Sequence, residues 1–375
     1  MASPATFWTP ELIEFTRGEA VSAGFDLAGV AEAFASEQDA GRLTAERFTA
    51  WIDEGRAGEM EYLKRRDEHG ELLRRSVRVA LPWARSVVVC AFNYNAAGPR
   101  SLDPAAAGDG WIARYAWNGT ESGEPTDYHD DLLARLRAVE TALHDVAECE
   151  TRCYVDTGPL LERDLAAKAG VGWVGKNTCV LNQKIGSWML LGVIVTSLPL
   201  GPGLSVEEAA DRCGSCTRCI DACPTDALVA PRQMDASLCI AYLTIEKKGS
   251  IAEELREPMG RQVFGCDICQ EVCPWNRRAP VSVRTGLATR DELINPALEW
   301  LGAMEQDEFR RRFRGSPLER TKLKRLRRNV AIAMGNSGEQ GFRPRLAEWA
   351  AAEDEVLAEA ASWALGRLAV KETED

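Results

Sequence analysis

Clustered cysteines constrain the fold of this chain more than any other feature of its sequence. Of 12 cysteines in 375 residues, eight fall between positions 213 and 273, namely Cys213, Cys216, Cys219, Cys223, Cys239, Cys266, Cys269 and Cys273. The first residues carry no basic segment leading into an apolar run, so we expect no signal peptide and a cytoplasmic protein. Clustered cysteines in such a protein indicate metal or cofactor chemistry rather than disulfides.

The first cysteine run has the spacing of a bacterial ferredoxin. Residues 213–224 read C-x2-C-x2-C-x3-C-P, a run whose fourth cysteine ligates the other of two [4Fe–4S] clusters. Pairs spaced C-x2-C also suit structural zinc, but this order of four cysteines is poorly suited to a tetrahedral zinc site. The run therefore predicts iron–sulfur clusters.

The second run is incomplete, and an isolated cysteine completes it. Residues 266–274 read C-x2-C-x3-C-P, with three thiols instead of four, and Cys239 is the replacement. The exchange of the fourth ligand then predicts two sets that use each cysteine once. The first set is Cys213, Cys216, Cys219 and Cys273, and the second is Cys223, Cys239, Cys266 and Cys269. We expect Cys90, Cys149, Cys153 and Cys179 to be buried structural thiols.

The rest of the sequence predicts an α+β protein of three regions. Residues 1–200 mix strand-like runs at 86–92 and 187–196 with a helical pattern at 131–147, and form an α/β domain. Residues 201–285 form a ferredoxin-like domain, and residues 286–375 are helical. Similar apolar helices end or break near Gly335 and Gly366, which is consistent either with a HEAT-like repeat or with a plain helical bundle. No apolar run is long enough to span a membrane.

One nucleotide-binding motif is rejected. Residues 170–175 match G-x-G-x-x-G, but a dinucleotide fingerprint follows a strand and opens a helix. Here a helix is expected at 160–169 and a strand at 178–181, which is the reverse order. We therefore predict no Rossmann nucleotide site.

Several motifs together resemble the epoxyqueuosine reductase family. They are Gly58-Glu-Met-Glu-Tyr-Leu63, Asp127-Tyr-His-Asp130, Tyr154-Val-Asp-Thr-Gly-Pro-Leu-Leu-Glu-Arg163, Ala169-Gly-Val-Gly-Trp-Val-Gly-Lys-Asn-Thr178, Cys239-Ile-Ala-Tyr-Leu-Thr-Ile-Glu246 and Cys273-Pro-Trp-Asn276. The resemblance covers nearly the whole chain. It implies an enzyme that uses cobalamin and two [4Fe–4S] clusters to reduce the epoxide of epoxyqueuosine in tRNA to queuosine. It also implies that residues 1–200 hold the corrinoid and that a HEAT-like tail contacts the tRNA.

Asp156 is the candidate catalytic acid, because opening an epoxide requires a proton for the departing oxygen. It follows a strand-like run and precedes a helix expected to begin near Pro159. Spacing alone favours a helix N-cap, and the resemblance favours the acid instead. A helix N-terminus would lower the pKa of this carboxyl, whereas a general acid at neutral pH needs a raised pKa.

His129 is not expected to bind cobalt. Residues 127–132 begin like the cobalamin-binding pattern D-x-H-x-x-G, but Leu132 replaces the glycine. From the sequence, His129 is expected to be a solvent-facing residue at a helix start. The resemblance places corrinoid contacts at Asp156 and at Arg65, Tyr115, Lys176, Asn177, Val180 and Leu191.

A basic stretch stands out in a chain of net charge −12. Residues 310–328 contain ten Lys or Arg, and we expect this stretch to bind tRNA phosphates, chiefly through Lys324, Arg325, Arg327 and Arg328. A solvated helix face is the alternative. We expect a monomer, no membrane partner, and an electron donor that the sequence does not identify. Other functions that we considered are a corrinoid reductase acting on another substrate, such as a dehalogenase, and a non-catalytic electron carrier.

Overall fold

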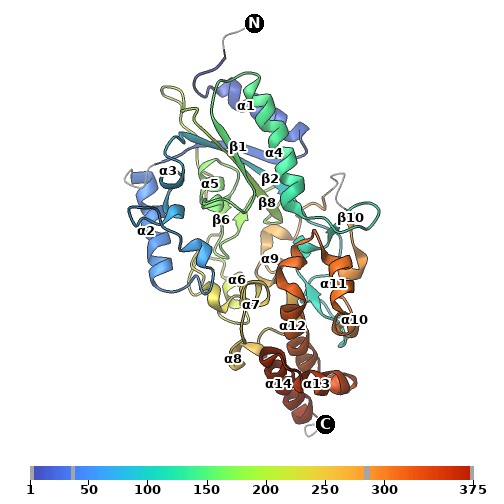
Figure 1. Cartoon of the computed structure of the whole chain (residues 1–375). Coiled ribbons are helices and arrows are strands. Elements are labelled where there is room, and N and C mark those ends of the chain that lie inside the picture. The colour runs from blue at the N-terminus through green and yellow to red at the C-terminus, as the bar shows by residue number, and fades with distance from the viewer. Residues whose placement is uncertain (1–3, 35–38, 283–287, 372–375) are drawn as a thin grey trace.

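The computed structural model describes residues 4–34, 39–282 and 288–371. A four-stranded antiparallel sheet forms the upper part of the molecule in Figure 1. Its strands lie in the order β1 (Leu27–Glu32), β2 (Ser86–Asn93), β8 (Met189–Thr196) and β5 (Thr151–Tyr154). The apolar runs at 86–92 and 187–196 are thus confirmed as strands, and they pair with each other at the centre of the sheet.

Helices cover both faces of this sheet, which explains why its central strands are apolar throughout. Side chains of β2 alternate between two cores, with Val88 on the face that α1 (Pro10–Ser22) and α4 (Tyr128–His144) cover. Val89 points to the other face, which α5 (Glu162–Lys168) covers. Every residue of β2 is buried. A strand covered on both faces needs no polar alternation.

The second region consists of short helices that follow the cysteines. They are α6 (Arg218–Asp221), α7 (Ile240–Ile245), α8 (Glu253–Arg256) and α9 (Ile268–Glu271). A hairpin of β6 (Trp173–Val174) and β7 (Val180–Leu181) approaches this region from the sheet domain. It comes directly after α5, so the glycine-rich segment 170–175 follows a helix and enters a strand, as predicted.

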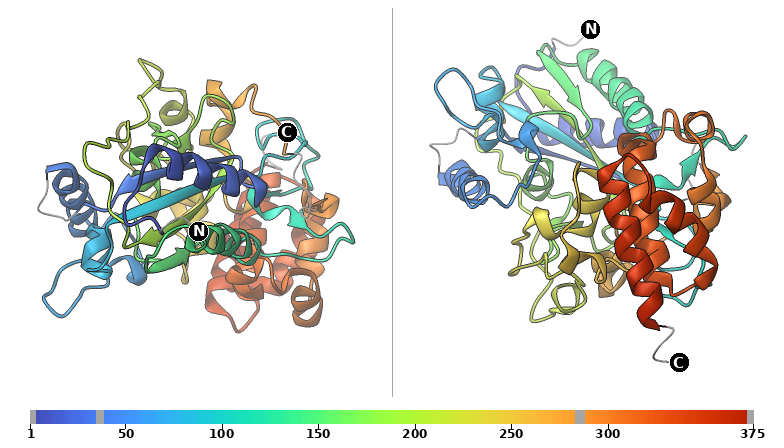
Figure 2. Two further views of the ribbon diagram at one scale, coloured as in Figure 1. Left: turned by 90° about the horizontal axis from the view of Figure 1, so that it is seen from above. Right: turned by 60° about the horizontal axis from the view of Figure 1, so that its bottom comes forward.

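The helical region lies at the opposite end from the sheet (Figures 1 and 2). It contains α10 (Leu298–Ala303), α11 (Gln306–Phe313), α12 (Lys322–Ser337), α13 (Arg343–Ala350) and α14 (Glu355–Lys371). The sequence led us to expect that a helix ends or breaks near Gly335, but this glycine lies within α12. A Cβ there would come within 2.8 Å of Ala364, so Gly335 lets α12 and α14 approach closely. The helix ends at Gly338, whose φ is +77°.

The remaining elements connect these regions. They are α2 (Asp39–Asp53), α3 (Val77–Ala80), β3 (Trp111–Ile112), β4 (Asn118–Gly119), β9 (Gln262–Phe264) and β10 (Ala288–Thr289). Short 3-10 helices are η1 (Glu61–Leu63), η2 (Leu73–Arg75), η3 (Arg114–Ala116), η4 (Ala236–Leu238), η5 (Pro274–Asn276), η6 (Asp291–Leu293), η7 (Pro317–Thr321) and η8 (Gln340–Phe342).

The three sequence segments do not have three separate cores. The largest apolar core contains Trp117 from the first segment, Phe264 from the second and Val330 from the third. Two small sheets tie the segments together, since β3 pairs with β9 and β4 pairs with β10. The predicted boundaries near 200 and 285 are therefore crossed by continuous packing.

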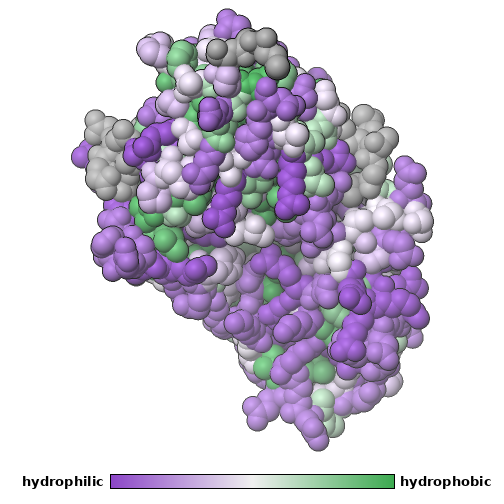
Figure 3. Space-filling model, turned by 45° about the horizontal axis from the view of Figure 1, so that its top comes forward, coloured by the Kyte–Doolittle hydropathy of each residue, from purple (hydrophilic) through white to green (hydrophobic). Residues whose placement is uncertain are grey.

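Hydrophilic side chains cover most of the face in Figure 3, and apolar residues reach this surface only in small separate patches. Within the described residues, none of the helices has the length and apolar character needed to cross a bilayer.

Candidate active site and cluster-binding thiols

The first predicted set of thiols lines one cavity. Cys213, Cys216, Cys219 and Cys273 surround a space of about 280 Å³ together with Lys176, Asn177, Leu181, Arg212, Arg218, Pro274 and Trp275. Burial raises the pKa of the Cys219 thiol to about 11, and the nearby Cys273 and Cys213 add to the rise. Cys273, the last cysteine of the second run, thus lies beside the first three cysteines of the first run. This is the arrangement that an exchange of the fourth ligand requires.

The second set also converges. Burial raises the pKa of Cys266 well above its ordinary value, and its neighbours Cys239 and Cys223 contribute to the rise. The pKa of Cys269 is raised as well, first by its contact with Cys179 and by burial, and further by the nearby Cys266 and Cys239. No three potential ligands among the described residues are placed to hold a single metal ion. A cubane does not require that placement, because each of its four thiolates binds a different iron. Both sets fit [4Fe–4S] clusters.

A ninth cysteine lies at the second set, where the sequence predicted only a structural thiol. The thiol of Cys179 is within hydrogen-bonding reach of the Cys269 thiol. The turn that presents it contains Thr178 at φ +65°, a backbone conformation that residues other than glycine rarely adopt. Beside it, the Asn177 amide donates to the Cys269 carbonyl at 3.3 Å. No spacing rule relates position 179 to either run, so sequence patterns could not find this contact.

Three of the expected corrinoid contacts lie on or near the β6–β7 hairpin. The Lys176 ammonium donates to the Gly214 carbonyl at 2.7 Å and lines the first thiol cavity. Asn177 contacts the second run, and Val180 is buried against the sheet. In this structure, the side chains of Lys176 and Asn177 therefore contact the loops that carry the cysteines.

The other expected contacts are spread around the lower end of the sheet. Leu191 is only half-buried although it lies on the central strand β8, so apolar surface is left uncovered there. The ring of Tyr115 meets Tyr128 edge-on at 6.0 Å and Phe264 at 5.9 Å between ring centres. Arg65 is exposed.

Asp156 lies at the same end of the sheet as Leu191. The last pair of β5 with β8 joins Tyr154 to Val193, and Asp156 follows two residues later. Its φ of +53° turns the chain out of the strand. The expected helix begins only at Glu162, so Asp156 is not its N-cap and the capping explanation is wrong. The Asp156 side chain is 55% exposed, and the Glu162 carboxylate accepts its backbone N–H at 2.9 Å.

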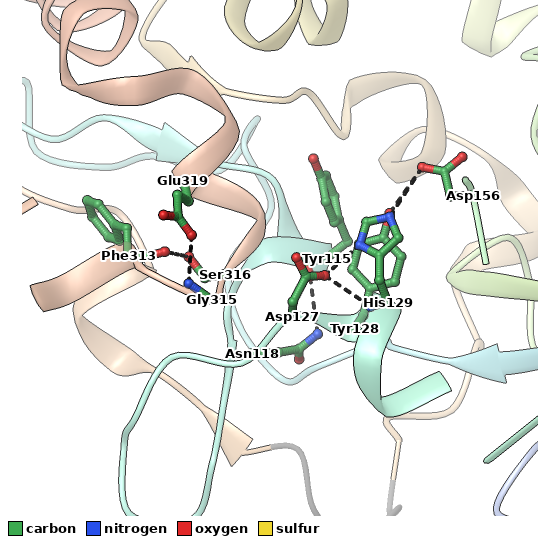
Figure 4. Close-up of polar contacts among 10 residues, drawn as sticks. All are labelled: Tyr115, Asn118, Asp127, Tyr128, His129, Asp156, Phe313, Gly315, Ser316 and Glu319. Carbon is green, nitrogen blue, oxygen red and sulfur yellow. Dashed lines mark hydrogen bonds and ion pairs between the residues drawn. The ribbon is translucent and has the colours of Figure 1, made fainter. Parts of the chain in front are cut away.

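Figure 4 shows two residues of α4 that point towards Asp156. The Tyr128 hydroxyl donates to Oδ2 of Asp156 at 3.2 Å, and Nε2 of His129 lies 3.8 Å from the same oxygen. Nδ1 of His129 lies 2.5 Å from Oδ1 of Asp127, the N-cap of α4. His129 is thus held between two carboxylates and only 19% exposed, which corrects its assignment as a solvent-facing residue.

These contacts determine the protonation of the site. Burial acts to lower the pKa of His129, but Asp127 and Asp156 outweigh it and raise the pKa to about 9. Burial acts to raise the pKa of Asp156, but His129 and the cations Arg320 and Arg163 leave it below its usual value. Burial raises the pKa of Glu162 to about 8, and the charge of Asp156 adds to this. The site therefore combines an ionised carboxylate with a charged imidazole.

The predicted nucleic-acid residues differ sharply in exposure. Arg328 is 1% exposed and donates to the carbonyls of Leu243, Lys247 and Gly249, so its predicted contact with tRNA is wrong. A helical position facing the core cannot be distinguished from a surface position in a dense basic run. Lys324 is 59% exposed and pairs with Asp354 at 3.1 Å.

The other two predicted residues are half-buried. Arg325 donates to the carbonyl of Thr321 at 2.9 Å. Arg327 pairs with Glu305 at 2.9 Å. Another residue of the basic stretch, Arg320, reaches towards the active site, where it pairs with Glu246 at 3.4 Å and its charge acts on Asp156.

Comparisons with known proteins agree over nearly the whole chain. A family model described as "4Fe-4S double cluster binding domain" matches residues 212–276, and one described as "Epoxyqueuosine reductase QueG" matches residues 74–157. Epoxyqueuosine reductase of Xanthomonas campestris is 35% identical over 92% of this chain and 93% of its own length. That of Escherichia coli is also 35% identical, over 92% of this chain and 86% of its own length.

Solved structures show the same fold. An epoxyqueuosine reductase crystallised with an epoxyqueuosine-modified tRNA stem loop superposes with a TM-score of 0.80, at 30% identity, over 96% of this chain and 89% of its own. The Bacillus subtilis enzyme, solved with a catalytic loop swung out of the active site, gives a TM-score of 0.79 at 30% identity, over 96% of this chain and 89% of its own.

Proposed function

The chain belongs to the epoxyqueuosine reductase family, and we propose that it reduces the epoxide of epoxyqueuosine in tRNA to give queuosine. The observation that carries the proposal is the arrangement at the end of the sheet. An open carboxylate, Asp156, lies beside a charged His129, and the same fold holds two sets of four thiols. A simple electron carrier would need only the thiols. The tRNA substrate would place the enzyme in the cytoplasm.

Two [4Fe–4S] clusters and cobalamin are the cofactors that we propose. When bound, cobalamin supplies the low-potential cobalt centre that reduces the substrate. The uncovered apolar surface at Leu191 lies at the end of the sheet that carries Asp156, and it fits a large ring with an apolar face. Tyr115 packs on Tyr128, whose hydroxyl contacts that carboxylate. Arg65 and the backbone near Val180 are the further contacts that the family suggests. The electron donor is a separate protein or small molecule.

The chain's own residues would position the substrate and move its protons. Asp156 is exposed and turned out of the strand, so it can approach an oxygen of the bound nucleoside. Tyr128 fixes the orientation of that carboxylate through its hydroxyl. General acid catalysis of this kind typically contributes about 10²–10⁴ in rate.

The helical region is the proposed tRNA surface, whether it forms a HEAT-like repeat or a plain bundle. Arg310, Arg311 and Arg314 are exposed, and Lys324 on α12 extends the same basic stretch. Arg320 connects this stretch to the active site because its charge reaches Asp156. Phosphate contacts of this kind would make affinity fall with salt.

The test is turnover of an epoxyqueuosine-containing tRNA stem loop with cobalamin, both clusters and a chemical reductant. We expect the parent enzyme to form queuosine and Asp156→Asn to be slower by about 10²–10⁴ with its cofactors still bound. Asp145→Asn, at the exposed end of α4, is the matched control. No queuosine from the parent enzyme would contradict the function. Unchanged turnover by Asp156→Asn would contradict only the role of the acid.

A further inference from the structure

We propose that Asp127, His129 and Asp156 form a proton relay, in which His129 stores the proton that Asp156 delivers to the departing oxygen. This inference rests on the proposed function. Conversion of the epoxide to an alkene breaks both C–O bonds, takes up two electrons and two protons, and releases the oxygen as water. A low-potential one-electron donor, acting twice through the clusters, supplies the electrons. The relay supplies one of these two protons, and the second is taken up from solvent.

The geometry places a proton donor directly behind Asp156. Both ring nitrogens of His129 face carboxylates, with Nδ1 at 2.5 Å from Asp127 and Nε2 at 3.8 Å from Asp156. Asp127 also accepts the backbone N–H of His129 at 3.0 Å, which fixes it in place as the cap of α4. A ring between two anions is held in its doubly protonated form. His129 therefore has a proton on the nitrogen that faces Asp156.

The 3.8 Å separation is an ion-pair distance, longer than a hydrogen bond. Catalytic hydrogen bonds are often long in a free enzyme and tighten when substrate binds. The Asp156 side chain is 55% exposed, so it has room to close this gap while it keeps the hydrogen bond from Tyr128, whereas His129 is held by its own contacts. Tyr128 keeps the pair aligned, since its ring stacks on His129 at 4.0 Å and its hydroxyl donates to Oδ2 of Asp156.

The charges around the relay favour a resting proton on His129. Arg320 from η7 and Arg163 from α5 help to keep Asp156 ionised, and Arg320 also acts on Asp127. The pKa of about 9 leaves His129 charged at neutral pH, while Asp156 has a pKa below its ordinary value. Asp156 cannot hold the proton at rest, so it passes on one that it receives from His129 when negative charge develops on the substrate oxygen.

Glu162 is a further carboxyl group near Asp156 and its pKa is raised, but it does not lie on this path. Its carboxylate accepts the backbone N–H of Asp156. Within the described residues, it makes no hydrogen bond with the Asp156 carboxylate. A proton on Glu162 therefore has no direct route to the substrate through this contact. Glu162 holds the position of the Asp156 backbone.

The first test measures the pKa of His129 and does not require turnover. The chain has only three histidines, His69, His129 and His144, so their titration can be resolved by NMR of the full-length protein labelled at histidine. We expect one histidine to titrate near pH 9 and to be lost in His129→Gln. In Asp127→Asn, which preserves the helix cap, its pKa should move towards the ordinary value of about 6.5. An ordinary pKa for His129 in the parent protein would overturn the relay.

The second test uses turnover of the epoxyqueuosine stem loop by holoenzyme. We expect parent activity to fall as pH rises through about 9, as His129 loses its proton. His129→Gln should lose this limb, be slower by about 10², and recover activity when imidazole is added as a proton donor. His144→Gln, at the far end of α4, is the control and should behave like the parent. Parent-like turnover by His129→Gln, or loss of the limb in Glu162→Gln instead, would overturn the relay. Failure of the parent enzyme itself would instead overturn the proposed function.

Discussion

The two thiol sets lie in different surroundings although their sequence runs are alike. Around the first set, Arg212, Gly214, Thr217 and Arg218 are exposed. Three cationic residues, Lys176, Arg212 and Arg218, line the cavity. Around the second set, the neighbours of Cys266 are buried, and both Cys239 and Cys266 pack against the largest apolar core. The first set therefore lies in exposed surroundings and the second in mostly enclosed ones, although the cysteines of the second set are themselves half-buried and Cys273 of the first set is buried.

The difference indicates a direction for the electrons. Gly265, beside Cys266, is so close to the active-site region that a Cβ there would meet Ala113 at 2.5 Å and Tyr115 at 3.6 Å. The next residue, Asp267, accepts the backbone N–H of Arg114 at 2.7 Å. The enclosed set therefore adjoins the segment that carries Tyr115. Electrons would enter at the exposed cluster and leave from the enclosed one.

The strongest test of this comparison removes one ligand from each set. We expect Cys216→Ala and Cys239→Ala each to reduce bound iron towards half and to abolish turnover, because both clusters lie on the path. Only Cys239→Ala should also lower the thermal unfolding temperature clearly, since that residue packs against the core. Iron analysis and calorimetry measure the two effects. Full iron in Cys239→Ala would disprove the assignment of its ligand set.

Controlled oxidation in the presence of a chelator should separate the clusters by access to solvent. We expect the parent protein to release iron in two phases of about equal size, because the two clusters hold equal iron. Cys216→Ala should retain only the slow phase and Cys239→Ala only the fast one. A single phase in the parent protein would contradict the difference in enclosure.

The smallest expected effect concerns Cys179. When Cys269 ligates a cluster it is a thiolate and accepts, so the Cys179 thiol would donate to it and stabilise the reduced cluster. Cys179→Ala should therefore lower the potential of the enclosed cluster. A hydrogen bond worth about 0.5–1.5 kcal/mol corresponds to roughly 20–60 mV for one electron. Potentiometric titration followed by electron paramagnetic resonance measures the shift. Cys153→Ala, on strand β5, is the control, and an equal shift in it would rule out a specific contact.

Much of this architecture could be predicted from the sequence, because it depends on local patterns. Apolar runs identified β2 and β8, helical periodicity identified α4, and cysteine spacing predicted both thiol sets. The active site depends on contacts between distant segments. The sequence around His129 predicts only an exposed residue at a helix start. Its role depends on Asp156, which the end of β5 brings close to it in the fold. Likewise, the backbone carbonyls that accept from Arg328 belong to residues 243–249. Nothing in the basic stretch itself indicates this contact.

The buried Arg328 has a consequence for how the protein is made. Its guanidinium bonds hold α12 to the end of α7, the helix that begins next to Cys239. During synthesis, Cys239 leaves the ribosome well before α12 can fold against it. All four thiols of the enclosed set precede α12 in the chain, so they emerge before the helix that packs beside them. Insertion of this cluster does not have to wait for the helical tail.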